Sequence, residues 1–243
     1  MSCNPWAQSA KIAPMLTLGI DTATEIGSVG LASDSSGGPF GELSFSARMG
    51  QAERLLQAVD RLLELSRVKV EELELIAVSS GPGSFTGLRI GLATAKGLAQ
   101  GLKIPLVGVP TAESYARRVE FWPGRVCVLI HDRRNLVYRT DFAGSGGERP
   151  IELELDRLEE IEAILAEDLK GRLFLGSGAE RYRGELEAQG GKVASRALNL
   201  PSGFQVALLG KAKFASTGED ELFSLEPRYL QRPLAEMRLE MSH

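Results

Sequence analysis

Short apolar runs separated by polar, glycine-rich turns open the chain. The runs cover residues 15–21, 27–33 and 41–47, and the first of them ends in Asp21. Runs of this length between turn residues are typical of strands, and the Asp-Ser-Ser-Gly-Gly-Pro segment at 34–39 predicts a hairpin between the second and third runs. The chain is therefore expected to begin with three strands.

The spacing of apolar residues then changes to intervals of three and four positions. From Ala52 to Leu63, apolar side chains recur at this spacing with charged side chains between them, which predicts an amphipathic helix of about four turns. The next predicted elements are a strand at 75–79, a glycine-rich turn at 81–87, a helix at 88–102 and a strand at 104–109.

The second half of the chain repeats this order of strands and helices in a shorter form. The expected elements are paired strands at 125–130 and 136–142, an apolar segment at 151–155, a helix at 156–169 with Asp156 as its N-cap, a strand at 173–175 and an amphipathic helix at 205–215. An α/β protein is therefore predicted, with two related units that each hold a mixed sheet. The expected division is a leader at 1–14, an N-terminal lobe at 15–109, a C-terminal lobe at 110–220 and a tail at 221–243.

Charge argues against a chain that binds nucleic acid by itself. Apolar residues make up 43 %, enough for a real core, and 28 Lys and Arg against 32 Asp and Glu give a net charge of -4. Such a chain lacks the general positive field with which nucleic-acid binders neutralise phosphates, so a partner would supply most of any RNA contact. Arg133 and Arg134 are candidates for a local basic patch.

Cysteine usage and hydropathy predict a cytoplasmic protein. Cys3 and Cys127 are the only cysteines, which speaks against a disulfide framework and fits a reducing compartment. No apolar run approaches the roughly 18 residues of a membrane-spanning helix, so no membrane association is expected. Residues 1–14 hold one lysine and no apolar block, unlike a secretory signal peptide.

Three loops hold residue types that can bind an anion or a nucleotide. The candidates are Asp21, Thr22 and Thr24 after the first strand, Gly83 and Ser84 in the glycine-rich turn, and Gly176 and Gly178 after the strand at 173–175. Backbone N–H groups of a turn, together with the N-terminus of a helix, can hold an anion. For the Asp21 loop, an ordinary turn with satisfied local donors is the alternative. The turn at 81–87 is not a Walker A loop, because no Gly-Lys-Ser/Thr follows it.

Glycines are unusually frequent in the second predicted helix. Gly87, Gly91, Gly97 and Gly101 lie in it or at its start. Each helical glycine costs roughly 0.5–1 kcal/mol relative to alanine, so a compensating close approach of another backbone is expected. Core packing within the chain and a partner helix from another chain both remain open as its source.

The segment Gly-Pro-Gly-Ser-Phe-Thr-Gly-Leu-Arg-Ile-Gly at 81–91 resembles the bacterial TsaB family, also called YeaZ. Further matches to this family lie at residues 20–24, 53–56, 95–99, 105–109 and 227–230. The resemblance spans roughly residues 15–230 and is dense over 15–115. It implies an actin-like ATPase (ASKHA) fold with two lobes.

The resemblance also implies partners and a surface for them. In this family the partner is TsaD, the catalytic paralogue that moves threonylcarbamoyl to adenosine 37 of certain tRNAs, and TsaE, a small ATPase, is the third member. A homodimer is expected when the chain is alone, and tRNA is met only through the complex. The pairing surface, carried onto the first two helices, comprises Gln51, Arg54, Leu55, Ala58, Val59, Leu62, Gly87, Ile90, Gly91, Thr94, Ala95 and Leu98.

The residues that TsaD-like proteins use for catalysis are missing. Those proteins bind their metal with two histidines four positions apart on the first helix, whereas this chain has Gln51 and Leu55 there, and its histidines are His131 and His243. Ser84 has no evident histidine base. We therefore expect a non-catalytic scaffold with no metal and no required cofactor, with weak binding of ATP or ADP left open.

Two alternatives to the scaffold are kept. One is an ATP-dependent enzyme of the actin-like superfamily acting on a small substrate, which the Asp21 loop and the turn at 176–178 suggest. Asp132 is the obvious candidate for its catalytic Asp. The other is a metalloprotease, against which the missing histidine pair argues.

Overall fold

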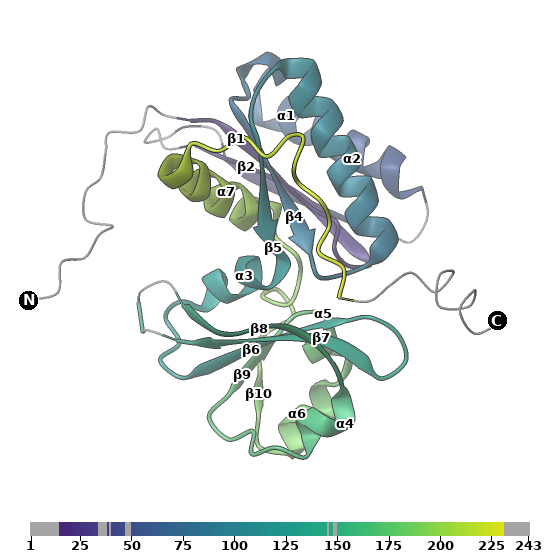
Figure 1. Cartoon of the computed structure of the whole chain (residues 1–243), viewed down its shortest axis with the longest axis vertical. Helices are drawn as coiled ribbons and strands as arrows, with labels where there is room; N and C mark the ends of the chain where they lie inside the picture. Colours follow the sequence, from purple (N-terminus) through teal and green to yellow (C-terminus); the bar gives the residue numbers. More distant parts are fainter. Residues whose placement is uncertain are drawn as a thin grey trace, which may run out of the picture.

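Two lobes, each built on a five-stranded sheet, make up the molecule (Figure 1). The computed structural model describes residues 15–33, 38, 40–46, 50–144, 146–147 and 150–230. The predicted leader at 1–14 and residues 231–243 of the predicted tail lie outside the described residues. Within the described part of the chain, no helix is long and apolar enough to cross a membrane.

The first sheet has the strand order β3-β2-β1-β4-β5. Its strands are β1 (Thr17–Asp21), β2 (Ile26–Ala32), β3 (Gly41–Ser46), β4 (Leu75–Gly81) and β5 (Leu106–Pro110). The first three strands pair antiparallel, whereas β4 pairs parallel to both β1 and β5. The prediction of a mixed sheet is confirmed for this lobe.

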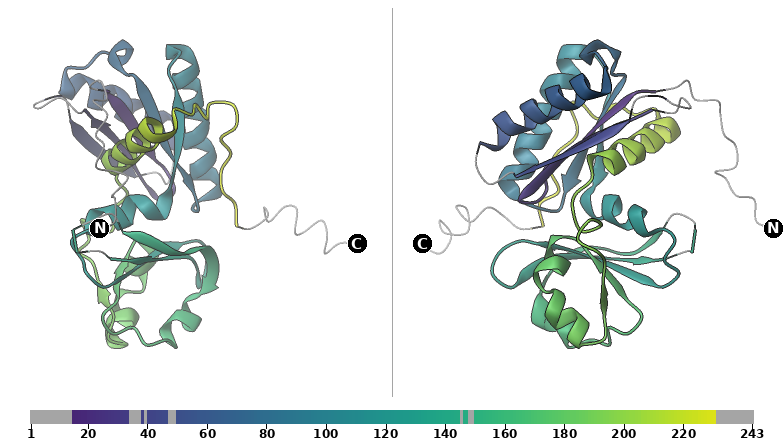
Figure 2. Two further views of the ribbon diagram at one scale, coloured as in Figure 1. Left: turned by 60° about the vertical axis from the view of Figure 1, so that its left-hand side comes forward. Right: turned by 180° about the vertical axis from the view of Figure 1, so that it is seen from behind.

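Helices cover both faces of the first sheet (Figure 2). The helices are α1 (Gln51–Ser66) and α2 (Phe85–Leu102) on one face and α7 (Gly203–Thr217) on the other, with a short 3-10 helix at Val70–Glu72. Successive side chains of β4 point to opposite faces of the sheet. Ile76 packs in the core with α1 and α2, whereas Ala77 packs with α7. A strand buried on two faces is apolar throughout, which is why the run at 75–79 was readable as a strand.

The second sheet has the strand order β10-β9-β6-β7-β8. Its elements are the strands β6 (Arg125–His131), β7 (Leu136–Ala143), β8 (Ile151–Glu160), β9 (Leu173–Leu175) and β10 (Lys192–Val193), with α3 (Thr111–Ala116), a 3-10 helix at Arg117–Val119, α4 (Ile161–Leu165), α5 (Ser177–Arg181) and α6 (Arg183–Ala188). This sheet is also mixed, because β6 pairs antiparallel to β7 and parallel to β9.

The helix predicted at 156–169 is wrong over its first part. Asp156 is not an N-cap but a residue of the edge strand β8, and only Ile161–Leu165 is helical. Cross-strand pairs hold this charged segment extended, since Thr140 on β7 donates a hydrogen bond to Asp156 and Arg139 Nη1 lies 3.2 Å from Glu159 Oε2. Such pairs stabilise a sheet edge although the spacing of apolar residues suggests a helix.

The helix α7 packs on the first sheet, so the expected C-terminal lobe at 110–220 is wrong in its last part. The contact is made backbone to backbone. A Cβ on Gly19 would lie 2.0 Å from the Gly203 carbonyl oxygen, and a Cβ on Gly30 would lie 2.1 Å from the Phe204 nitrogen. Glycine is the residue that permits this distance. The second lobe is therefore an insertion between β5 and α7.

This contact predicts a sharp loss of stability in Gly19→Ala. The new methyl group would collide with rigid backbone atoms of α7 rather than with a movable side chain, so we expect a loss of at least about 1–3 kcal/mol in the free energy of unfolding. Urea denaturation of the purified protein measures it. Gly184→Ala in α6 is the control, because a Cβ there meets no described atom within 4 Å. Equal effects of the two substitutions would contradict the close contact.

Candidate functional site

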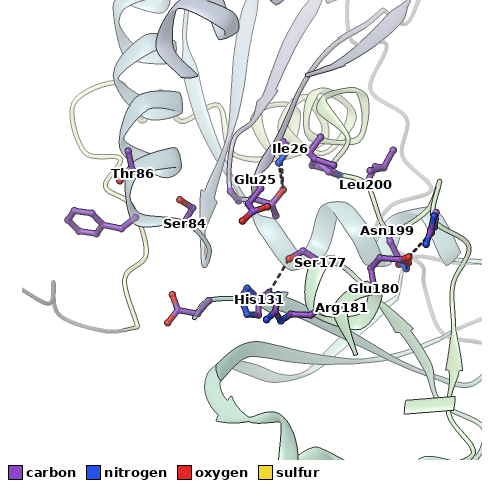
Figure 3. A pocket seen from close by; sticks show the side chains of 16 residues that line it. Glu25, Ile26, Ser84, Thr86, His131, Ser177, Glu180, Arg181, Asn199 and Leu200 are labelled. Carbon is purple, nitrogen blue, oxygen red and sulfur yellow. Dashed lines mark hydrogen bonds and ion pairs between the residues drawn. The ribbon is translucent and has the colours of Figure 1, made fainter. Parts of the chain in front are cut away.

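A cleft of about 870 Å³ lies between the two lobes. Its first-lobe wall comes from the β1–β2 turn, residues 23–26, and from the start of α2, residues 84–86 (Figure 3). Its second-lobe wall comes from the end of β6, the helix α5 and residues 199–201. The loops singled out in the sequence therefore meet at one place, from both lobes.

Hydrogen bonds lock the two first-lobe loops together. The Ser84 N–H donates to the Ala23 carbonyl at 2.7 Å, and Ser84 Oγ accepts from the Gly87 N–H at 3.2 Å, which caps the start of α2. A Cβ on Gly83 would lie 2.5 Å from the Ala23 carbonyl oxygen. Gly83 thus permits the close contact of the loops, and Ser84 fixes the N-terminus of α2 at the cleft wall.

The carboxylate of Asp21, a predicted nucleotide- or anion-binding residue, does not line the cleft. Asp21 is fully buried, and its Oδ1 accepts hydrogen bonds from the Ala23 N–H at 3.0 Å and from Ser79 Oγ at 3.1 Å. Oδ2 has no hydrogen-bond partner among the described residues. Burial raises the pKa of Asp21 to about 6, although the two hydrogen bonds lower it. Of the three candidates in this loop, Thr24 is the one that lines the cleft.

Thr22 explains one of the helical glycines. Its Oγ1 donates to the Gly87 carbonyl at 2.8 Å, and a Cβ on Gly91 would lie 2.1 Å from the same Oγ1. The close approach at Gly91 is therefore made inside the chain, by the loop after β1. It does not require a partner helix.

In the second lobe, a glycine with a positive φ shapes the wall. Gly176 has a φ of 96°, and its N–H donates to Asn199 Oδ1 at 3.2 Å. Ser177 Oγ accepts from the His131 N–H at 3.0 Å, and Gly178 packs against Leu129. The Gly176–Gly178 turn therefore joins β6 to the segment around residue 199, and its N–H at position 176 is already used.

Charges of both signs line the cleft. Glu25, Asp132 and Glu180 lie along it with Arg181 and Arg196. Hydrogen bonding from Arg183, with help from Asn199 and Arg196, lowers the pKa of Glu180 to about 2. These three carboxylates and two guanidinium groups give the cleft no net positive charge with which to hold a polyphosphate. Within the described residues, no group of three or more His, Cys, Asp and Glu is placed to hold a metal ion.

Most of the predicted partner surface lies in the core of the first lobe. The buried members are Leu55, Ala58, Val59 and Leu62 on α1, and Gly87, Gly91 and Ala95 on α2. Ile90, Thr94 and Leu98 are half-buried, Arg54 is exposed with its Nη1 3.1 Å from the Ser46 carbonyl, and the side chain of Gln51 is outside the description. The buried members cannot contact a partner directly, because the core of their own lobe and the loop after β1 cover them.

The exposed face of α2 is different from the face that was expected. Ala93, Gly97 and Gly101 recur every four residues and are exposed, with Ile90 and Thr94 beside them. Apart from the nearby backbone of α2 itself, no described atom lies within 4 Å of a Cβ built on Gly97 or Gly101. The helical period could have identified this face, since these positions fall opposite the buried Leu88, Leu92 and Ala95.

The C-terminal segment brings a cluster to the start of α2 that the sequence did not predict. The rings of Phe85 and Tyr229 lie 4.8 Å apart, Arg89 Nε donates to Tyr229 Oη at 3.0 Å, and the Arg89 guanidinium lies 3.8 Å from the centre of the Phe85 ring. The Pro-Arg-Tyr-Leu segment at 227–230 was the available signal.

The fold and the cleft define a two-lobed α/β protein with mixed sheets and an interlobe cleft, as in the actin-like class. The family model described as "TsaD: tRNA N6-adenosine threonylcarbamoyltransferase" matches residues 46–236. Among solved structures, YeaZ from Pseudomonas aeruginosa is similar with a TM-score of 0.73 and 25 % identity, over 89 % of this chain and 100 % of that one. The predicted actin-like fold is confirmed.

Sequence relatives identify the branch of this class. The chain is 30 % identical to the tRNA threonylcarbamoyladenosine biosynthesis protein TsaB of Bacillus subtilis, over 76 % of this chain and 81 % of the relative. It is 27 % identical to the protein of the same name from Haemophilus influenzae, over 91 % and 96 % of the two chains. The chain belongs to the TsaB family, as its motifs indicated.

The buried Asp21 predicts that Asp21→Asn stabilises the protein at neutral pH. The folded protein holds the Asp21 proton more tightly than the unfolded chain, so stability falls as pH rises from about 4 to about 6. A pKa that rises from 3.8 to about 6 on folding corresponds to about 3 kcal/mol. The asparagine keeps an acceptor at Oδ1 and removes the buried charge, so we expect a gain on the order of 1–3 kcal/mol at pH 8 and little at pH 4.

Urea denaturation of both proteins between pH 4 and pH 8 measures the effect. Asp60→Asn, on the exposed face of α1, is the control. A gain that does not vary with pH would contradict the assignment of a buried, proton-binding carboxyl group.

Proposed function

We propose that this chain is a non-catalytic subunit of the machinery that makes N6-threonylcarbamoyladenosine at position 37 of tRNA. It binds and organises a TsaD transferase, and TsaE joins the assembly. Membership of the TsaB family supports this proposal. The observation that carries it is the exposed face of α2, formed by Ala93, Gly97 and Gly101.

Among the described residues, nothing explains two of the glycines of α2. Gly91 is required by the contact with Thr22, but Gly97 and Gly101 face open space and each costs roughly 0.5–1 kcal/mol relative to alanine. Small residues at every fourth position let a second helix approach closely along one face. A partner helix packed on this face would offset the cost that the isolated chain bears.

The cleft supports a non-catalytic subunit. The carboxylate that would face a nucleotide-bound metal in an actin-like ATPase, Asp21, is buried and bonded to Ser79, and carboxylates line the open part of the cleft. We therefore propose that the chain needs no cofactor, and that any binding of ATP or ADP is weak.

Charge supports an indirect role toward RNA. The net charge of -4 provides no general field for phosphates. We propose that tRNA is held by the partner in the assembled complex. In the absence of TsaD, the same face of α2 would pair two copies of this chain.

The partner surface is tested with Gly97→Arg. Position 97 is exposed, and a Cβ there meets no described atom within 4 Å apart from the helix's own nearby backbone, so we expect the fold to be kept while a partner helix is pushed away. We expect the dissociation constant for TsaD from the same source to rise at least about tenfold, which corresponds to about 1.4 kcal/mol. Isothermal titration calorimetry measures it.

Gly184→Arg is the matched control, since Gly184 is also an exposed helical glycine with open space around it, but in α6 of the second lobe. It should bind TsaD like the original protein. Unchanged affinity in Gly97→Arg, or an equal loss in both variants, would reject the assigned surface.

The non-catalytic role is tested by ATP turnover of the isolated chain. We expect no turnover above background, and no difference between the original protein and Asp21→Asn, because Asp21 is closed off from the cleft. The release of phosphate from ATP by the purified chain, without TsaD or TsaE, measures this turnover. Turnover that Asp21→Asn abolishes would instead favour an ATP-dependent enzyme of the actin-like superfamily.

A further inference from the structure

The segment after α7, residues 221–230, returns along the first lobe to the junction of the lobes; we call it the strap (Figures 1 and 2). It begins on β5, where the Glu221 N–H donates to the Leu106 carbonyl at 2.8 Å and Glu221 Oε2 accepts from the Gly108 N–H at 2.7 Å. Leu225 packs against the core of the first lobe, above Gly108. The strap is thus fixed to the first lobe over its first half.

The strap then crosses the end of β4. The Arg228 N–H donates to the Ser80 carbonyl at 2.7 Å, and a Cβ on Gly81, whose φ is 107°, would lie 2.9 Å from the Arg228 carbonyl oxygen. Tyr229 follows and stacks on Phe85 at the start of α2. The backbone of the strap therefore belongs to the first lobe up to its last described residues.

The side chain of Arg228 reaches the other lobe. Its Nη2 lies 3.2 Å from Asp156 Oδ2 on β8, the edge strand of the second sheet. Arg228 also acts on a second carboxylate of this strand: burial and Asp156 raise the pKa of Glu152, whereas Arg228 lowers it. One guanidinium on the strap thus pairs with Asp156 and also acts electrostatically on Glu152.

The burial of Asp156 gives this ion pair its energetic weight. The Asp156 side chain is only 3 % exposed, while that of Arg228 is 41 % exposed. The carboxylate also accepts a hydrogen bond from Thr140 on the neighbouring strand. Removing the partner of a buried charge is costly, whereas losing an exposed pair between flexible side chains has little effect. Separation of strap and β8 would leave Asp156 without this cation.

We propose that the strap is a latch that holds the two lobes at one width of the cleft. Over the residues that the structure describes, the chain crosses between the lobes twice, after Pro110 and before Gly203, and two such crossings form a hinge. The helix α3 also packs on β4, β5 and α7 of the first lobe, and the Arg228–Asp156 pair adds a further non-covalent link at the edge strand β8. Opening the cleft breaks this pair, and the same movement pulls on Tyr229 and so on α2.

Hydrogen exchange of the isolated full chain tests the latch, with Arg228→Ala as the variant. We expect the cleft-lining segments at 23–26, 131–132 and 177–181 to exchange at least about fivefold faster, while the slow amides of β1 and β4 stay unchanged. Arg61→Ala is the control, because it also removes an ion pair, with Glu64, but within a single helix. It should leave the cleft segments as they are.

The double variant Asp156→Asn, Arg228→Ala identifies the bond responsible. With the buried charge gone, removal of Arg228 should add no further exchange at the cleft beyond that of Asp156→Asn alone. The latch is wrong if Arg228→Ala leaves the exchange of the cleft segments unchanged. It is also wrong if exchange rises equally in the cores of both lobes, or if Arg228→Ala raises exchange at the cleft just as much in the Asp156→Asn background. None of these readouts depends on TsaD, so they are separate from the test of the proposed function.

Discussion

At Gly19, Gly30 and Gly203 the backbone of α7 lies directly on the backbones of β1 and β2, with no side chain between them. This contact places a helix from the far end of the chain on the first sheet, opposite α1 and α2. It therefore makes the second lobe an insertion and brings the chain back across the junction. The cleft, the return of the strap and the exposed position of α2 all follow from where α7 is held.

Local patterns predicted most elements, because the spacing of apolar residues identifies both amphipathic helices and strands that are buried on two faces. They failed where the deciding contact was distant in sequence. Asp156 looked like a helix start, but Thr140 and Arg228 hold it in a strand. The helix α7 follows the second lobe in sequence, and only the glycines it meets on β1 and β2 assign it to the first.

The candidate site was predicted in its loops but not in its chemistry. The sequence pattern of an apolar helix face such as that of Leu55 is the same whether its own sheet or a partner covers the face. The pattern therefore did not separate the buried members of the predicted surface from the exposed ones. The glycines of α2 divide in the same way: Gly91 accommodates Thr22, whereas Gly97 meets open space. The loop of Asp21 does face the cleft, but Ala23 and Ser79 turn its carboxylate inward.

The insertion of the second lobe also has a consequence for synthesis on the ribosome. The ribosome makes β4, β5, α1 and α2 early. The face of their sheet that holds Ala77 and Val107 stays uncovered until α7, which packs on it, has been synthesised. The second lobe, from α3 to β10, is contiguous in the chain and has its own core. It can therefore fold before the lobe that precedes it, in the reverse of the usual order for successive domains.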